Sequence, residues 1–111
     1  MAGKYAVHVV NNIYPVSSSP LLLHCASGND ELGNHQLYHH QDFHWSFCEQ
    51  IFHRTLFFCR FRWGSKNIAF EVFNTTSLSV CKHSCYWEAH ADGVYFSGDY
   101  PRIGLAKMYP W

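Results

Sequence analysis

Residues that can do chemistry are concentrated in the stretch Leu21–His40, which reads LLLHCASGNDELGNHQLYHH. It carries Cys25, the adjacent acids Asp30 and Glu31, and four of the nine histidines of the chain. Thiolate, imidazole and carboxylate groups ligate metal ions and transfer protons in catalysis. Whether they can meet at one site depends on the elements that carry them.

A structural zinc site needs four cysteine or histidine ligands, usually in two closely spaced pairs. Cys81 and Cys85 could supply one such pair. The neighbours His24–Cys25 and His39–His40 cannot easily supply another, because adjacent residues of a strand point to opposite faces. A calcium loop needs a spaced series of Asp and Asn oxygens, which Asp30–Glu31 does not provide. The sequence therefore predicts no metal site and no cofactor.

Nucleophilic catalysis needs a nucleophile, a base and a group that orients the base. The chain has no G-x-S-x-G motif and no recognisable cysteine-protease context. Histidine pairs also serve ribonucleases, but those enzymes need a basic groove for phosphates. Here eight basic residues are balanced by eight acidic ones. The sequence therefore predicts no catalytic residue, no enzyme activity and no nucleic-acid partner.

Five cysteines in a chain of 111 residues are typical of an oxidised, secreted domain. Cys25, Cys59 and Cys85 fall on the apolar faces of expected strands. Four cysteines allow three pairings, and a Cys81–Cys85 bond would close a loop too short to constrain the unfolded chain much. We therefore favour the bonds Cys25–Cys85 and Cys59–Cys81. Cys48 is predicted to remain a thiol in a monomer; the alternative is an intermolecular disulfide that makes a dimer.

The dominant hydrophobic period is two, which predicts strands with one buried face. The expected strands lie around residues 5–9, 21–25, 43–48, 57–63, 68–72 and 85–90. Asp92-Gly93, between two alternating runs, predicts a hairpin, whereas Glu49–Arg54 suits one short helical turn. We expect an all-β, single-domain antiparallel β-sandwich over residues 1–111, stabilised by two disulfides. The tail 97–111 could add an edge strand.

The composition supports a folded domain outside the membrane. It is 48% hydrophobic and 18% aromatic, but only 14% charged, against about 25% in a typical soluble domain. No apolar run approaches the roughly 18 residues of a membrane span, so we expect no membrane insertion. The N-terminus MAGKYAVHVV lacks the features of a signal peptide. We expect a secreted protein in its mature form, restarted with an added methionine, and Asn74 begins a possible N-glycosylation sequon.

An ordered series of short motifs runs along the chain. The motifs are His24-Cys25-Ala26-Ser27, Glu31-Leu32-Gly33, Trp45-Ser46-Phe47, Thr55–Trp63 and Cys85-Tyr86-Trp87. In this order they resemble the plant self-incompatibility protein family, which comprises the stigmatic S proteins of poppy and the S-protein homologues. The resemblance covers about residues 7–95. The four cysteines of the family map onto Cys25, Cys59, Cys81 and Cys85.

The resemblance implies a small secreted plant protein with a disulfide-bonded β-sandwich and no catalytic residues. Stigmatic members in poppy are recognised by a membrane protein on incompatible pollen, so we expect an extracellular ligand for a membrane receptor protein on another cell. The alternatives are a secreted glycan-binding or antimicrobial defence protein, and a metal or pH sensor that uses the histidines. Contact residues are expected in turn-rich loops. The candidates are Asn29, Asp30, Glu31, Gln50, His53, Ser65 and Lys66.

Overall fold

Two β-sheets enclose the hydrophobic core. The computed structural model describes residues 4–15, 19–28, 30–48, 56–74, 84–98 and 104–111. The strands are β1 (Lys4–Asn11), β2 (Leu21–Ser27), β3 (Glu31–Leu37), β4 (Asp42–Cys48), β5 (Leu56–Trp63), β6 (Lys66–Asn74), β7 (Ser84–His90), β8 (Gly93–Ser97) and β9 (Ala106–Pro110). No helix among the described residues is long and apolar enough to cross a membrane. The predicted helical turn Glu49–Arg54 lies outside the described residues.

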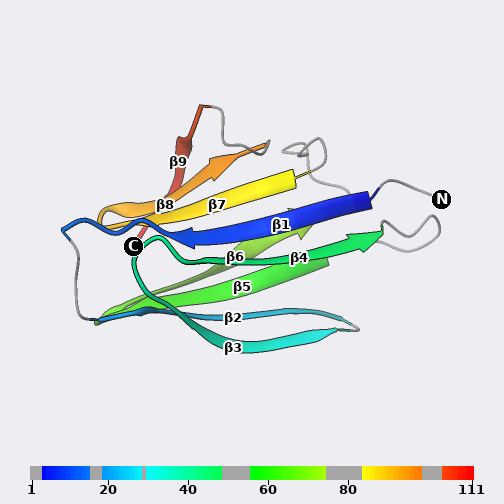
Figure 1. Cartoon of the computed structure of the whole chain (residues 1–111), viewed down its shortest axis with the longest axis horizontal. Coiled ribbons are helices and arrows are strands. Elements are labelled where there is room, and N and C mark those ends of the chain that lie inside the picture. The colour runs from blue at the N-terminus through cyan, green and yellow to red at the C-terminus, as the bar shows by residue number, and fades with distance from the viewer. Residues whose placement is uncertain (1–3, 16–18, 29, 49–55, 75–83, 99–103) are drawn as a thin grey trace.

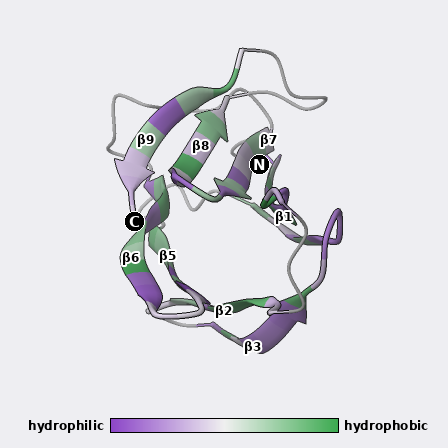
Figure 2. Cartoon of the chain, turned by 90° about the vertical axis from the view of Figure 1, so that its left-hand side faces the viewer, coloured by the Kyte–Doolittle hydropathy of each residue, from purple (hydrophilic) through white to green (hydrophobic). Residues whose placement is uncertain are grey.

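The strands are divided between a five-stranded and a four-stranded sheet (Figure 1). Sheet A has the order β4-β1-β7-β8-β9, and sheet B has the order β3-β2-β5-β6. Figure 2 looks along the strands and shows the two sheets on either side of a shared interior. The predicted all-β architecture with two sheets is therefore confirmed.

Sheet A is mixed, so the prediction of a purely antiparallel sandwich was wrong in one strand pair. β1 runs parallel to β7, with Val9 opposite Trp87, and antiparallel to β4. Between β1 and β7 the chain forms β2, β3, β5 and β6 of sheet B and crosses back once to form β4 of sheet A. β7 then runs beside β1 in the same direction. A hydrophobic period of two indicates which face of a strand is buried, but it carries no information on strand direction.

The buried face of β2 agrees with the alternation of its sequence, whereas β7 is buried on both faces. On β2, Leu21, Leu23 and Cys25 are buried, whereas His24 lies on the outer face. Burying one such aliphatic side chain contributes roughly 1.5–3 kcal/mol. The core residues are Val7, Val9, Ile13, Leu21, Leu23, Cys25, Leu37, Phe57, Cys59, Phe61, Phe70, Val72, Phe73, Cys85, Trp87, Ala89 and Val94.

Trp87 ties the two sheets together. Its indole lies in the core on β7 of sheet A, and its Nε1–H donates to the carbonyl oxygen of Val72 on β6 of sheet B at 3.1 Å. A buried indole N–H needs an acceptor, because leaving it unpaired costs about 1–3 kcal/mol. This bond therefore contributes to the fixed position of one sheet on the other.

The disulfide of the described residues joins Cys25 to Cys59. These residues are direct partners on the neighbouring strands β2 and β5, with Cα atoms 4.1 Å apart. The predicted bonds Cys25–Cys85 and Cys59–Cys81 were therefore wrong, because the bond lies within sheet B and does not cross the core. Cys85 is also disulfide-bonded, while Cys81 lies outside the described residues. Cys48 is exposed and keeps its thiol.

A short turn closes the predicted hairpin at Asp92-Gly93. β7 and β8 pair up to His90 opposite Gly93, as the Asp92-Gly93 signal predicted. Gly93 is in a backbone region that favours glycine, with φ of 155°, and a Cβ there would lie 2.3 Å from the carbonyl oxygen of Tyr109. The approach of β9 therefore requires a glycine at this position. β9 pairs with β8 at the edge of sheet A, so the tail does add an edge strand.

Candidate functional site

The residues predicted for recognition that the structure describes do not gather at one surface. Asp30 and Glu31 are exposed at one end of sheet B, and Ser65 and Lys66 are exposed at the other end. Because β2 and β5 are antiparallel neighbours, the β2–β3 connection and the β5–β6 turn fall at opposite ends of the sheet (Figure 1). The other candidates, Asn29, Gln50 and His53, lie outside the described residues.

Glu31 belongs to strand β3, and its carboxylate is engaged by nearby groups. One carboxylate oxygen accepts a hydrogen bond from the backbone N–H of Gly33 at 3.0 Å and also contacts the His24 ring. The Gly33 bond, followed by the His24 bond, lowers the pKa of Glu31 below its ordinary value. This arrangement stabilises the bulged pairing of β2 with β3 next to Cys25 and Gly33. Glu31 therefore has a local structural role.

A different surface is built where the β1–β2 connection meets the β3–β4 turn. Asn11 is 4% exposed and links the two segments. Its Nδ2 donates to the carbonyl oxygen of Leu37 at 2.8 Å, and its Oδ1 accepts from the N–H of Ile13 at 3.1 Å. Its backbone N–H donates to Gln41 at 3.1 Å, and its carbonyl accepts from His40 at 2.7 Å. One buried side chain and its peptide groups therefore hold both segments.

The β3–β4 turn is closed by its own residues. The N–H of Gln41 donates to the carbonyl oxygen of Tyr38 at 3.0 Å, and the side-chain oxygen of Gln41 accepts from the N–H of Tyr38 at 2.8 Å. Between them, His40 has φ of 68°, a left-handed conformation that is uncommon for a residue other than glycine. The bond from His40 to Asn11 holds this conformation in place.

Two tyrosine side chains on these segments are exposed to solvent. Tyr14 is 55% exposed and Tyr38 is 52% exposed. The Tyr14 ring lies edge-on to the His39 ring with centroids 4.5 Å apart, and its hydroxyl is 3.3 Å from Nε2 of His40. The His39 and His40 rings are 3.8 Å apart. We call Tyr14, Tyr38, His39 and His40 the tyrosine end; it lies at the left of Figure 1 and faces the viewer in Figure 2.

The signal for the tyrosine end in the amino-acid sequence is weak. The contact residues predicted from turn-rich loops include neither Tyr14 nor Tyr38. Both tyrosines lie just beyond the end of a strand, β1 or β3, next to turn-forming or histidine residues. Aromatic residues immediately outside the alternating runs are the signal that would have found them.

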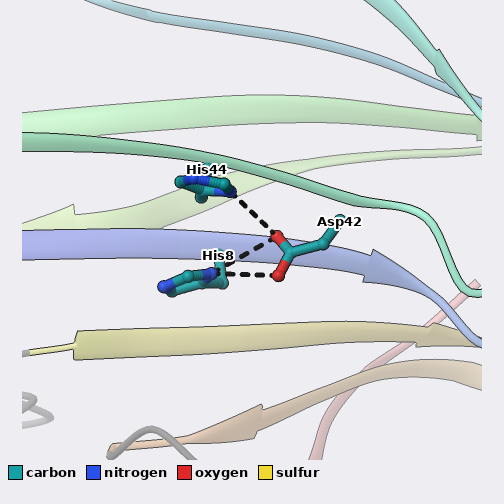
Figure 3. A group of neighbouring side chains, drawn as sticks. All are labelled: His8, Asp42 and His44. Carbon is teal, nitrogen blue, oxygen red and sulfur yellow. Dashed lines mark hydrogen bonds and ion pairs between the residues drawn. The ribbon is translucent and has the colours of Figure 1, made fainter.

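The outer face of sheet A carries a second cluster, made of His8, Asp42 and His44 (Figure 3). His8 on β1 lies directly opposite His44 on β4. Nδ1 of His8 is 3.1 Å from Oδ2 of Asp42, and Nδ1 of His44 is 3.6 Å from Oδ1 of Asp42. The prediction of no metal site rested on ligands that are close together in the chain. Here His8 and Asp42 are 34 residues apart, and strand register brings them together.

The outer face of sheet B holds a basic hollow of about 340 Å³. Arg60, Arg62 and His24 bring basic side chains to its lining, together with Asn34. Nη1 of Arg60 also donates to Oδ1 of Asn67 at 2.8 Å. The hollow can therefore offer hydrogen-bond donors and positive charge to an anionic group.

The sequence profile of the family described as plant self-incompatibility protein S1 matches residues 6–111. The chain belongs to this family. S-protein homolog 29 of Arabidopsis thaliana is 35% identical over 109 residues, which are 98% of this chain and 78% of that protein. S-protein homolog 5 of Arabidopsis thaliana is 33% identical over 97 residues, covering 86% of this chain and 71% of that protein. The resemblance stated from the motifs is thus confirmed.

A solved structure shows that the fold of this S-protein homologue is shared. It is described as a structure of SPH (Self-Incompatibility Protein Homologue) proteins, a widespread family of small, highly stable, secreted proteins from plants. It matches with a TM-score of 0.65 and 21% identity, over 99% of this chain and 91% of that chain. The protein is therefore a member of a family of small secreted plant proteins, as expected from its cysteines.

Proposed function

We propose that this S-protein homologue is an extracellular ligand, which a membrane receptor protein on another cell recognises through the tyrosine end. It acts by binding and not by catalysis. The observation that carries the proposal is the exposure of Tyr14 and Tyr38 on two segments that one buried residue, Asn11, clamps together. Membership of the self-incompatibility family supports the ligand role.

Tyrosine is suited to such a contact. It offers a large apolar ring and a polar hydroxyl, and it is enriched at protein interfaces and among the residues that dominate binding energy. Large exposed hydrophobic side chains are few in the described part of the chain: Tyr14, Tyr38, Phe58 and Met108. Two of the four lie at the tyrosine end, which makes it the best candidate contact surface.

The rigidity of the tyrosine end favours binding. Ordering a flexible loop on association costs free energy, so a surface that is already ordered binds more tightly. The hydrogen bonds of Asn11 and the closed turn Tyr38–Gln41 order this surface before a receptor binds, which lowers that cost. Equal numbers of acidic and basic residues mean that shape and aromatic contact, rather than long-range steering, would dominate recognition.

Site-specific photo-crosslinking tests this proposal. A photoreactive phenylalanine analogue at position 38 should crosslink to a membrane protein when the oxidised protein is added to plant cells. The same analogue at position 58, an exposed aromatic site on the outer face of sheet B, should not. Equal crosslinking from both positions, or crosslinking from position 58 alone, would contradict a contact at the tyrosine end.

The basic hollow of sheet B favours a second candidate function, the binding of an acidic plant glycan. Two guanidinium groups and an imidazole border one hollow, and arginine pairs well with carboxylate groups. Binding of polygalacturonate that Arg62→Ala weakens, and that Tyr38→Ser leaves unchanged, would favour this function. No binding to polygalacturonate would remove it.

A further inference from the structure

We propose that His8, Asp42 and His44 form a binding site for a divalent transition-metal ion on the outer face of sheet A. The proposal is independent of the tyrosine end and of the receptor. It also departs from the absence of a metal site that the sequence predicts.

The ligand atoms of the cluster already converge. One ring nitrogen of His8, a carboxylate oxygen of Asp42 and one ring nitrogen of His44 all lie within 4.8 Å of one another (Figure 3). Bond lengths of about 2.0–2.2 Å in a tetrahedral zinc site place neighbouring ligand atoms about 3.3 Å apart. From Oδ1 of Asp42, Nδ1 of His8 lies 3.3 Å away and Nδ1 of His44 lies 3.6 Å away, which is close to this value. A metal ion could therefore be bound with small side-chain movements.

The strands hold two of the ligands on one face. His8 and His44 are a directly opposed pair of β1 and β4, and their rings stack with centroids 5.0 Å apart. Asp42 begins β4 two residues before His44, so its side chain lies on the same face. Backbone hydrogen bonds of the sheet therefore preorganise the three side chains, which lowers the cost of assembling the site.

The chemistry of the set indicates which ions fit. Two imidazole nitrogens and one carboxylate oxygen suit Zn²⁺, Cu²⁺ or Ni²⁺, whereas Mg²⁺ and Ca²⁺ prefer oxygen ligands alone. The side chains of His8, Asp42 and His44 are 13%, 29% and 61% exposed. The site is thus closed on the sheet side and open to solvent on the other. A water molecule or a donor from another molecule would complete the coordination.

Isothermal titration calorimetry of untagged protein with Zn²⁺ tests the site. We expect saturable binding of one ion per chain, no detectable binding of Mg²⁺, and affinity at least tenfold lower in His44→Ala and in Asp42→Asn. His44 is well exposed on an edge strand, so its replacement should leave the fold intact, which far-ultraviolet circular dichroism verifies. Histidine ring signals in ¹H–¹⁵N spectra should show that Zn²⁺ replaces the proton at Nδ1 of His8 and His44.

His24→Ala provides a matched control. His24 is also a partly exposed strand histidine beside a carboxylate, that of Glu31, but it lies on sheet B. Its replacement should leave the zinc affinity unchanged. The proposal is wrong if the wild type shows no saturable binding, if folded His44→Ala binds as tightly as the wild type, or if His24→Ala loses as much affinity as His44→Ala.

Discussion

Cys25 and Cys59 face each other in register on β2 and β5, and their disulfide cross-links two neighbouring strands of one sheet. The bond closes a loop between residues 34 positions apart. Both residues are fully buried at the centre of sheet B. The bond therefore fixes the pairing of β2 with β5, from which the hairpins of sheet B extend.

Removing this bond should destabilise the protein. For Cys25→Ala combined with Cys59→Ala, we expect the free energy of unfolding to fall by about 2–4 kcal/mol, because the unfolded chain loses a long-range constraint. Denaturant titration measures the change.

Peptide mapping under non-reducing conditions should link the Cys25 peptide to the Cys59 peptide. Cys81 is then the expected partner of Cys85. A Cys25–Cys85 link would contradict the structure.

The cysteines also show what a sequence can and cannot predict. The alternation of Leu21, Leu23 and Cys25 with Leu22 and His24 correctly predicted which face of β2 is buried. That prediction succeeds because side chains alternate strictly along a strand. The partner of Cys25 depends on which strand lies next to β2 and in which register, and those are set by contacts between distant segments.

The same limit applies to the candidate sites. Turn residues such as Asp92-Gly93 act locally and were predicted correctly. The parallel pairing of β1 with β7 and the meeting of His8 with Asp42 depend on register between distant strands. The tyrosine end depends on Asn11, whose role becomes visible only when β1 and the β3–β4 turn lie side by side. The sequence therefore predicted individual strands and turns better than the contacts between distant segments.

Asn11→Ala should loosen the tyrosine end. The substitution removes two side-chain hydrogen bonds of Asn11. The buried carbonyl oxygen of Leu37 and the buried N–H of Ile13 each lose that partner. We expect the free energy of unfolding to fall by about 1–3 kcal/mol, with faster amide exchange at His40 and Gln41. Asn34→Ala, at an exposed position of β3, is the matched control and should change neither quantity. Unchanged exchange in folded Asn11→Ala would show that Asn11 is not the clamp.

Gly93→Ala should displace β9. The added Cβ would lie 2.3 Å from the carbonyl oxygen of Tyr109 and 3.2 Å from Cα of Pro110, so the edge strand must move. We expect a loss of about 1–3 kcal/mol in the free energy of unfolding, as for other overpacked sites, and faster amide exchange along β9. Gly28→Ala, where a Cβ would meet nothing within 4 Å, should be nearly neutral. Equal effects of the two substitutions would contradict this account of Gly93.

The hydrogen bond between Tyr95 and Asp92 should shape the pH dependence of stability. The Tyr95 hydroxyl donates to Oδ2 of Asp92 at 2.8 Å, and Nζ of Lys107 lies 3.3 Å from the same oxygen. The Tyr95 bond is the main cause that lowers the pKa of Asp92, and the same bond raises the pKa of Tyr95. The bond therefore favours a charged Asp92 and a neutral Tyr95 in the folded state.

The two shifts place the loss of this contribution at opposite ends of the pH scale. The Asp92 contribution is present above its ordinary pKa of 3.8 and is lost as the pH falls through the lower folded value. The Tyr95 contribution is present below its ordinary pKa of 10.0 and is lost as the pH rises through the higher folded value. The stability advantage of the wild type over Tyr95→Phe should be constant between about pH 5 and 9 and shrink outside that range. Tyr38→Phe is the control. A difference in the free energy of unfolding between the wild type and Tyr95→Phe that stays constant from about pH 2.5 to about pH 11 would contradict this prediction.

Saturation binding of labelled protein to intact plant cells tests recognition through the tyrosine end most directly. Tyr14→Ser combined with Tyr38→Ser should weaken binding at least tenfold, since interface tyrosines often contribute about 2 kcal/mol or more. Phe58→Ser, which removes an exposed aromatic ring from the outer face of sheet B, should stay within about twofold of the wild type. Unfolding midpoints should confirm that all three proteins are folded. Wild-type affinity in the folded tyrosine variant would contradict recognition through this surface.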